Sequence, residues 1–496
     1  MSILLIYAQN RSYMKRCLFF LKYGIALFAF SFFSAASCHK TTGATAQRSD
    51  TLTSGTSVAW WLTKGDGTVL FQQEAPLYFN TAAGNNLLIE VDTTQTFQPM
   101  DGFGYTLTGG SAQHLNRMSA AARVALLHEL FATDGNAIGV SYLRISIGAS
   151  DLDAHPFSYD DLPAGETDGD LKKFDLGPDK QVLLPVLKQI LAINPAIKIL
   201  GSPWSPPVWM KDNGDTRGGS LMPEWYGAYA RYFIKYIEAM KAEGIAIDAI
   251  TIQNEPLHPG NNPSLLMLPE QQAAFIKTSL GPAFRAANLK TKIILYDHDL
   301  DRPDYPISIL ADADAAQYVD GSAFHLYAGT IEAMSKVHDA YPTKNLYFTE
   351  QWIGAPGHLS GDLKWHVKNL IIGAPRNWAR TVLEWNLSSN PALQPHTDRG
   401  GCDQCLGAVT IDGDKVTRNP AYYIIAHASK AVRPGSARIG STASSTLPNV
   451  AFKTPGGKKV LIVLNDGTAA QNFQVRFGGN YFTASLDAGS VATYVW

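Results

Sequence analysis

The segment Ile247-Asp-Ala-Ile-Thr-Ile-Gln-Asn-Glu-Pro256 decides how this chain of 496 residues folds. Its β-branched apolar run is typical of a buried strand, and Glu255 follows the run directly. A second segment, Asn345-Leu-Tyr-Phe-Thr-Glu-Gln-Trp352, has the same form and carries Glu350 near its end. In a (β/α)8 barrel the catalytic groups stand at the C-terminal tips of parallel strands. The two segments therefore predict a barrel with both glutamates at one end.

Further strand candidates follow the same pattern along the chain, and helix-like stretches separate most of them. The eight candidates are Gly102–Leu107, Ser141–Ile147, Lys198–Ser202, Asp248–Gln253, Lys292–Asp297, Gly321–Leu326, Asn345–Thr349 and Thr381–Asn386. Successive βα units of this kind predict an α/β fold, a (β/α)8 TIM barrel. Alternating strands also precede the barrel and return after Pro434. We expect these two end segments to pair as one side β-sandwich domain.

These patterns set the predicted domain boundaries. Residues 1–38 form a signal peptide with a lipobox, and the Thr/Ser/Gly/Ala-rich residues 39–57 form a linker. Residues 58–98 supply the N-terminal strands of the side β-domain, and residues 99–430 form the catalytic barrel. Residues 431–496 complete the side domain, which is therefore expected to contain both flanks of the barrel.

The N-terminal segment is predicted to direct export. Lys15 and Arg16 precede an apolar run that is too short to span a bilayer, and small residues follow that run. The sequence Ala35-Ala-Ser-Cys38 resembles a bacterial lipobox, in which the cysteine is lipidated; simple cleavage beside an incidental cysteine is the alternative. We expect an exported lipoprotein anchored to the cell envelope, in the periplasm or at the outer-membrane surface.

Composition limits the partners and the cysteine chemistry. A formal net charge of -2 argues against a nucleic-acid binder, and 46% hydrophobic residues allow a large core. Beyond the export segment only Cys402 and Cys405 remain, as Cys-Asp-Gln-Cys in a Gly-flanked loop. No second cysteine pair exists for zinc, and no thioredoxin-like pattern surrounds this one. A short structural disulfide in an exported loop is expected.

Two carboxyl groups at strand tips suit the hydrolysis of a glycosidic bond, because one acts as acid and the other as nucleophile. Capping or salt-bridged glutamates are the alternative. A metal-dependent hydrolase is a competing hypothesis, since His298 lies between Asp297 and Asp299 after a strand. No H-E-x-x-H or comparable spacing supports it. We therefore expect no metal and no cofactor.

An ordered set of motifs carries a family resemblance. The motifs are Asp101-Gly-Phe-Gly104, Leu143-Arg-Ile-Ser146, Gly201-Ser-Pro-Trp-Ser-Pro-Pro-Val-Trp-Met-Lys211, Thr251-Ile-Gln-Asn-Glu-Pro256, Phe324-His-Leu-Tyr327, Phe348-Thr-Glu350 and Glu384-Trp-Asn386. From about residue 58 to the C-terminus the chain resembles glycoside hydrolase family 30, which contains glucosylceramidases and endo-β-1,6-glucanases. The resemblance implies a retaining mechanism with Glu255 as acid/base and Glu350 as nucleophile. We accordingly expect a raised pKa for Glu255 and an ionised Glu350.

The resemblance also implies residues that bind the substrate. Arg144 would lie near the nucleophile and hold Glu350 ionised. Asn254 would bind the sugar 2-hydroxyl. The other residues implied at the cleft are His325, Tyr327, Trp204 and Trp385. Each has a structural alternative, as an ion pair, a turn residue or a filler of the core.

One departure from the family pattern bears on the substrate. Glucosylceramidase-type members usually carry an Asp after the first strand, where Gly104-Tyr-Thr-Leu-Thr-Gly-Gly110 places Gly109. The run resembles the β-1,6-glucanase branch, and an Asp restored at position 109 should shift the balance toward aryl glucosides if the cleft is otherwise like that of its relatives. We expect a retaining hydrolase of β-linked glucans, most of all an endo-β-1,6-glucanase. The alternatives are an exo-acting β-glucosidase or glucosylceramidase-like enzyme, and a non-catalytic glycan-binding lipoprotein.

Overall fold

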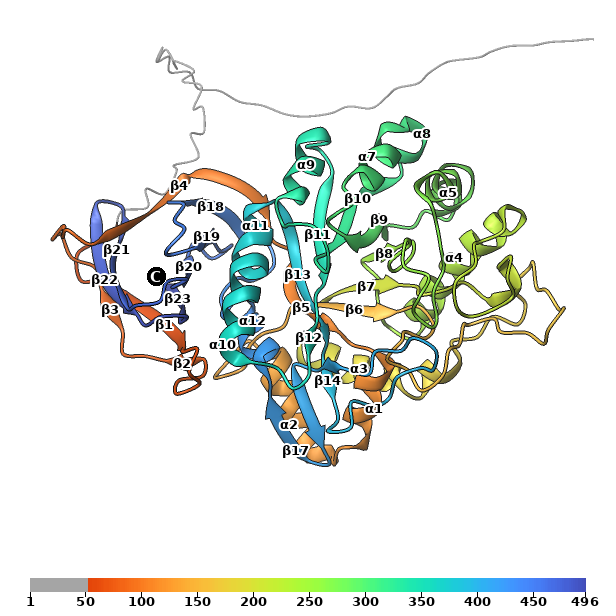
Figure 1. Cartoon of the computed structure of the whole chain (residues 1–496), viewed down its shortest axis with the longest axis horizontal. Coiled ribbons are helices and arrows are strands. Elements are labelled where there is room, and N and C mark those ends of the chain that lie inside the picture. Colours follow the sequence, from red (N-terminus) through yellow and green to blue (C-terminus); the bar gives the residue numbers. More distant parts are fainter. Residues whose placement is uncertain (1–51) are drawn as a thin grey trace, which may run out of the picture. The chain divides into compact units, whose positions relative to one another are not determined.

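A computed structural model describes residues 52–496 (Figure 1). The predicted signal peptide, Cys38 and most of the predicted linker lie outside the described residues. Within the described part, no helix has the length and apolar character that a bilayer span requires.

Eight parallel strands close into a barrel, as the sequence predicts. In chain order they are β5 (Gly102–Thr106), β6 (Tyr142–Ser146), β7 (Lys198–Ser202), β8 (Ala249–Thr251), β9 (Lys292–Asp299), β10 (Val319–His325), β11 (Asn345–Glu350) and β13 (Ala379–Asn386). Each strand pairs with the next in the sequence, and β13 pairs with β5 to close the ring. All eight candidate segments thus form the barrel, and their C-terminal ends meet at one face.

Helices cover the outside of the barrel (Figure 1). The α-helices between the strands include α1 (Gly109–Arg117), α2 (Ala120–Phe131), α3 (Leu183–Ile193), α4 (Tyr226–Ala242), α7 (Asp304–Ala311), α8 (Ala313–Ala316) and α9 (Ala333–Ala340). Helix α4 shows why they form, since Tyr229, Phe233, Tyr236 and Met240 recur at helical spacing and are all buried. Apolar stripes of this kind fix each helix against the strands.

Two predicted helices are not continuous α-helices. The stretch Pro269–Ala287 consists of α5 (Pro269–Phe275), the π-helical segment η4 (Ile276–Leu280) and α6 (Gly281–Ala286). The stretch Asp362–Ile372 likewise changes from α10 (Leu359–His366) into the π-helical segment η5 (Val367–Gly373), which α11 (Ala374–Arg376) follows. Hydrophobic periodicity indicates the helix but does not reveal these extra residues per turn.

The side domain is built from both ends of the described chain (Figure 1). The N-terminal strands are β1 (Ser57–Thr63), β2 (Gln72–Gln73), β3 (Leu77–Tyr78) and β4 (Leu87–Pro99). The C-terminal strands are β18 (Ala437–Ser441), β19 (Asn449–Lys453), β20 (Lys459–Leu464), β21 (Gln471–Phe477), β22 (Asn480–Leu486) and β23 (Val491–Val495). Strand β23 lies between β1 and β20, and β4 lies between β18 and β21. The two segments therefore interleave and share one hydrophobic core.

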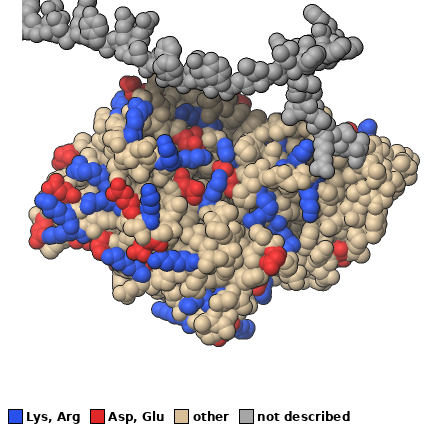
Figure 2. Space-filling model, turned by 180° about the vertical axis from the view of Figure 1, so that it is seen from behind, with Lys and Arg blue, Asp and Glu red and all other residues tan. Residues whose placement is uncertain are grey.

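Helix α12 (Pro420–Ser429) joins the barrel to the side domain. Its buried His427 lies 2.9 Å from the hydroxyl of Thr493 on β23 and 2.8 Å from the hydroxyl of Thr63 on β1. On the face shown in Figure 2, basic and acidic side chains are interspersed over the part that carries most of the charge. This face offers no continuous basic track among its described residues.

Candidate active site

Glu255 follows β8 and Glu350 ends β11, so both stand at the C-terminal face of the barrel. They are 8% and 6% exposed and line one cavity of about 350 Å³. A carboxylate oxygen of Glu255 and one of Glu350 lie within 4.8 Å of each other. Retaining glycosidases place their two carboxyl groups roughly 5–5.5 Å apart, which leaves no room for a water between them and the sugar. The spacing therefore suits a covalent mechanism.

The backbone of Glu255 is held in an unusual conformation. Its φ is +45°, in the left-handed region that side chains with a Cβ rarely adopt. Its N–H donates to the carbonyl of Asp297 at 3.0 Å, and Asp297 itself has a φ of +67°. Strained backbone of this kind persists only where the surroundings impose it. Here it directs the Glu255 side chain into the cavity.

Arg144 binds Glu350, the residue that the resemblance implies as nucleophile. Its guanidinium group is fully buried and donates to Glu350 Oε2 at 2.5 Å and to Asn254 Oδ1 at 2.6 Å. The Asn254 oxygen accepts this hydrogen bond, so its amide nitrogen is left to donate a hydrogen bond to a sugar hydroxyl. The guanidinium carbon also lies 4.8 Å from the ring centroid of Trp204 and 5.7 Å from that of Trp385. Arg144 thus fixes the carboxylate and the floor of the cavity together.

Asp297 is a central residue that the sequence pattern did not single out for this role. Its buried carboxylate accepts from Arg144 at 2.9 Å, and the ring of His325 lies 3.1 Å away. Hydroxyl donors complete the set, from Ser202, Thr251 and Thr349. Burial opposes ionisation, but Arg144 and His325 hold the pKa of Asp297 well below its usual range. Asp297 is therefore a fixed negative charge beneath the site.

His325 lies between three carboxylates. Its Nδ1 is 3.1 Å from Glu255 Oε1 and 3.8 Å from Glu350 Oε1, and its Nε2 is 3.1 Å from Asp297 Oδ1. Burial opposes the charged ring, but these carboxylates raise the pKa of His325 to about 10. At neutral pH the imidazole is therefore protonated and donates to both Glu255 and Asp297.

The expected order of the two glutamate pKa values is reversed. Burial acts to raise the pKa of Glu255, but the hydrogen bond and charge of His325 lower it to about 2. Burial raises the pKa of Glu350, against the charges of His325 and Arg144. The lowered pKa of Glu255 is opposite to the expected direction, because the His325 ring lies 3.1 Å from its carboxylate and favours the charged form.

Tyr327 and the tryptophans lie where the resemblance places them. The Tyr327 hydroxyl donates to Glu350 Oε1 at 2.9 Å, which leaves Glu350 with a fixed partner on each oxygen. Trp204 and Trp385 line the cavity with ring centroids 5.4 Å apart. Glu384 does not line the cavity; it lies 2.8 Å from the His366 ring.

Further residues line the cavity besides those implied by the resemblance. Asn261 donates to Glu255 Oε2 at 3.3 Å, and Trp352 follows the nucleophile by two residues. Asp151 is 6% exposed, and its Oδ1 has no hydrogen-bond partner among the described residues. Burial and the charges of Glu350 and Glu255 raise the pKa of Asp151 to about 8. A buried carboxyl group with a free oxygen in a cavity is prepared to bind a polar ligand group. His258 and His298 complete this side of the lining.

The space that a side chain at position 109 would need is filled by the carboxylate of Asp153. A Cβ on Gly109 would lie 1.7 Å from Oδ1 of Asp153, whose other oxygen accepts from the N–H of Ser150 at 2.8 Å. An Asp at position 109 would therefore require the Asp153 carboxylate to move, and its effect on substrate choice stays a prediction. Asp153 does not line the cavity.

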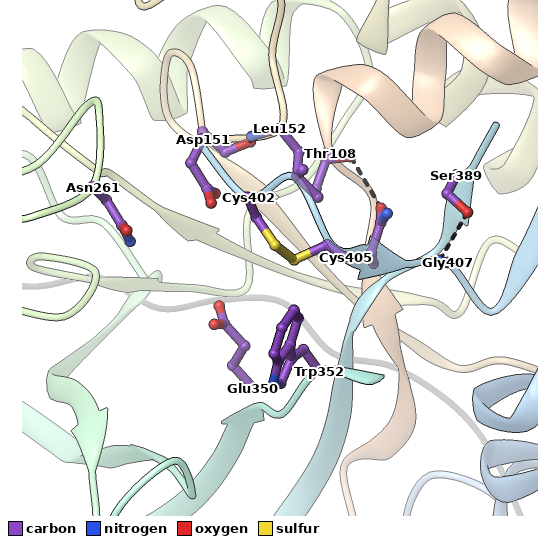
Figure 3. The surroundings of a disulfide bond; sticks show 12 residues. Thr108, Asp151, Leu152, Asn261, Glu350, Trp352, Ser389, Cys402, Cys405 and Gly407 are labelled. Carbon is purple, nitrogen blue, oxygen red and sulfur yellow. Dashed lines mark hydrogen bonds between the residues drawn. A yellow bond between two sulfur atoms is a disulfide. The ribbon is translucent and has the colours of Figure 1, made fainter. Parts of the chain in front are cut away.

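Cys402 and Cys405 form a disulfide in the cavity wall (Figure 3). The loop that carries them returns as β15 (Cys405–Leu406), which pairs with β12 (Ile353–Gly354) directly after Trp352. Beyond it, β16 (Val409–Asp412) pairs with β14 (Ser388–Ser389) and with β17 (Lys415–Arg418). The disulfide is thus tied to the loop that follows the nucleophile.

Comparison with known sequences decides the family. The glycosyl hydrolase family 30 TIM-barrel domain matches residues 100–432, and the family 30 beta sandwich domain matches residues 435–494. The chain belongs to glycoside hydrolase family 30. Because enzymes of this family are retaining, the carboxylate pair has the geometry that a family 30 hydrolase requires.

Relatives of this family 30 chain include enzymes with two activities. It is 35% identical over 434 residues to the endo-1,6-beta-D-glucanase neg1 of Aspergillus fumigatus, covering 83% of this chain and 86% of the relative. It is 28% identical over 443 residues to the lysosomal acid glucosylceramidase of Mus musculus, covering 83% and 84%. The solved structure of the endo-beta1,6-glucanase BT3312 is 37% identical, with a TM-score of 0.83, and the match covers 89% of this chain and 99% of that one.

Proposed function

We propose that this family 30 hydrolase is an endo-β-1,6-glucanase that cleaves its substrate by double displacement. The observation that carries the mechanism is the pair of buried carboxylates within 4.8 Å at the barrel mouth. The relatives with endo-1,6-beta-D-glucanase activity are more similar to this chain than the glucosylceramidase is. Aromatic side chains, amides and carboxyl groups line the cavity, which suits a neutral sugar chain better than an anionic one.

In the first step Glu350 attacks the anomeric carbon, and the bond from that carbon to the leaving oxygen breaks. Arg144 and Tyr327 hold the attacking carboxylate through one oxygen each. His325 Nδ1 first passes its proton to Glu255 across the 3.1 Å hydrogen bond, and Glu255 then gives this proton to the leaving oxygen and becomes a carboxylate again. His325 then stays neutral with its remaining proton on Nε2, where Asp297 accepts it.

In the second step Glu255 takes a proton from water, and the water oxygen attacks the same carbon. The ester bond to Glu350 breaks and the carboxylate is regenerated. Two inversions give net retention of configuration. Asn261, which donates to Glu255, lies on the side of the cavity where the leaving group departs and the water enters.

The product pattern on reduced β-1,6-gluco-oligosaccharides tests this function. An endo-acting enzyme releases mixed short oligosaccharides from the start, with retained configuration at the new reducing end. Release of glucose alone, with no intermediate sizes, would overturn the endo assignment in favour of an exo-acting β-glucosidase. A protein that binds β-1,6-glucan without cleaving it would fit the glycan-binding alternative instead.

We further propose that the enzyme is an exported lipoprotein with Cys38 as its lipid-bearing first residue. The sequence Ala35-Ala-Ser-Cys38 after a short apolar run supports this. Mass spectrometry of the mature N-terminus, together with release of a Cys38→Ser variant from the membrane fraction, tests it. Recovery of a Cys38→Ser variant in the same membrane fraction as the parent would contradict the anchor.

A further inference from the structure

The Cys402–Cys405 disulfide has a position that stabilisation of the fold does not explain. It links residues only three apart in the sequence. Closing so short a loop removes little conformational freedom from the unfolded chain, so its effect on global stability is small. Both cysteines nevertheless line the cavity that holds Glu255 and Glu350. A local role at the site is the simpler reading of this placement.

The disulfide belongs to an aromatic cluster at the cavity. Cys405 is 5% exposed and packs with Leu152, Trp204 and Trp385, while Trp352 and Cys402 pack on the same cluster from the partly exposed side. Polarisable sulfur makes favourable contacts with aromatic rings. The result is a continuous apolar surface that presents sulfur and an indole to the cavity (Figure 3).

Hydrogen bonds fix this surface from several directions. The N–H of Ala355 donates to the carbonyl of Gln404 at 2.8 Å, beside the β12–β15 ladder. The N–H of Thr397 donates to the carbonyl of Asp151 at 2.9 Å, and the backbone N–H of Cys402 favours the charged form of the Asp151 carboxyl group. The disulfide loop therefore connects the loop after the nucleophile to the loop after β6. A change in the disulfide would move both Trp352 and Asp151.

The disulfide lies on one identifiable side of the cavity. Figure 3 shows the carboxyl groups of Asp151 and Glu350 facing the same space, with the disulfide and Trp352 on one side and Asn261 on the other. Asn261 donates to the acid/base Glu255, so its side receives the leaving group. The disulfide is therefore on the glycone side, where the part of the sugar chain bound covalently to Glu350 lies.

We propose that the Cys402–Cys405 disulfide is a substrate-contacting element of the glycone site, which with Trp352 forms an apolar wall for a β-glucose ring. Sugars bind to apolar surfaces through the C–H groups of one ring face, and the hydroxyl groups at the ring edge meet polar residues such as Asp151. The disulfide and the hydrogen bonds of its loop together hold this wall in place. The inference rests on the proposed β-glucanase function and adds a specificity determinant to it.

Reduction supplies the direct test. Dithiothreitol attacks one sulfur as a thiolate, the S–S bond breaks, and two protonated thiols form on Cys402 and Cys405 while the reagent closes to its cyclic disulfide. The wild-type enzyme is assayed before and after reduction on an aryl β-glucoside and on an aryl β-gentiobioside, which share a leaving group. Reduction is expected to increase KM by about tenfold or more and to change kcat by a smaller factor. The increase in KM should be larger for the gentiobioside than for the glucoside.

A Cys402→Ser/Cys405→Ser double variant gives the same comparison without reagent, and dithiothreitol should not change it further. Thermal unfolding of the variant should stay within a few degrees of the parent. If the variant does not fold, reduction of the folded wild type still decides the question. KM values within twofold in all forms, from an active wild type, would overturn the role of the disulfide alone. A wild-type enzyme inactive on every β-glucoside would overturn the proposed function as well.

Discussion

Arg144 Nη1 lies 2.5 Å from Glu350 Oε2, and both side chains are withdrawn from water. The same guanidinium group binds Asp297, so one buried cation serves two buried carboxylates. A buried charge left without its partner is strongly destabilising, which makes this group of side chains sensitive to single changes. Substitutions in this group of side chains should therefore keep the volume of the side chain, so that a loss of activity is not caused by a loss of folding.

Glu350→Gln should abolish turnover, because the amide cannot form the covalent intermediate. A loss of about 10⁴-fold or more in kcat is expected on every β-glucoside that the parent hydrolyses. Glu384→Gln is the matched control, since Glu384 is equally buried but lies outside the cavity lining. Turnover of the Glu350 variant within tenfold of the parent would refute the assignment.

Glu255→Ala should behave differently with substrates that have good leaving groups. Such substrates need little acid assistance in the first step, so the glycosyl-enzyme still forms and its hydrolysis becomes slow. Azide, which needs no general base, should restore turnover and give a β-glycosyl azide. NMR of the product checks this, and an azide product of inverted configuration would exclude Glu255 as the acid/base.

Asp297→Asn should lower kcat by about 10²–10³-fold and change KM little. The amide keeps the volume but removes the charge that holds Arg144 and His325. With that charge gone, the pKa of His325 should fall, and the alkaline limit of activity should move to lower pH. A pH–rate profile with the parent's alkaline limit would show that Asp297 has only a packing role.

Asp151→Asn should change how stability depends on pH. The pKa of Asp151 is raised to about 8, so between its unfolded value and pH 8 the native state binds a proton that the unfolded state releases. Stability therefore falls as pH rises through this window. The variant should lose that slope and unfold at a higher temperature than the parent at pH 8, with little difference at pH 4. Calorimetry at the two pH values measures it, and parallel curves would contradict it.

Deletion of residues 435–496 should prevent the barrel from folding alone. The deletion removes β23 from between β1 and β20 and takes both neighbours from β4. The remaining N-terminal strands are too few to bury a core. Expression of the truncated chain as insoluble or protease-sensitive protein is expected, and a soluble and fully active barrel would disprove the coupling.

Local sequence was sufficient to predict the barrel strands and the place of Glu255 and Glu350 at its C-terminal face. Glu255 and Glu350 stand directly after recognisable buried runs, and strand order then brings them together. The role of Asp297 was not predictable, because its ligands come from β6, β7, β8, β10 and β11 and meet only in the closed ring. The direction of the Glu255 pKa shift could not be predicted for the same reason. His325, which lowers this pKa, is far from Glu255 in sequence and 3.1 Å away in space.

Because β23 pairs with β1, the side domain cannot close until the end of the chain has been synthesised. A ribosome adds roughly 5–20 residues per second, so β1 emerges tens of seconds before the strand that pairs along its length. During that interval its apolar face has no permanent cover. A chain kept unfolded for export avoids this delay, because the whole polypeptide is available before the sandwich begins to close. A product of interrupted synthesis, by contrast, would expose β1 and be open to proteolysis.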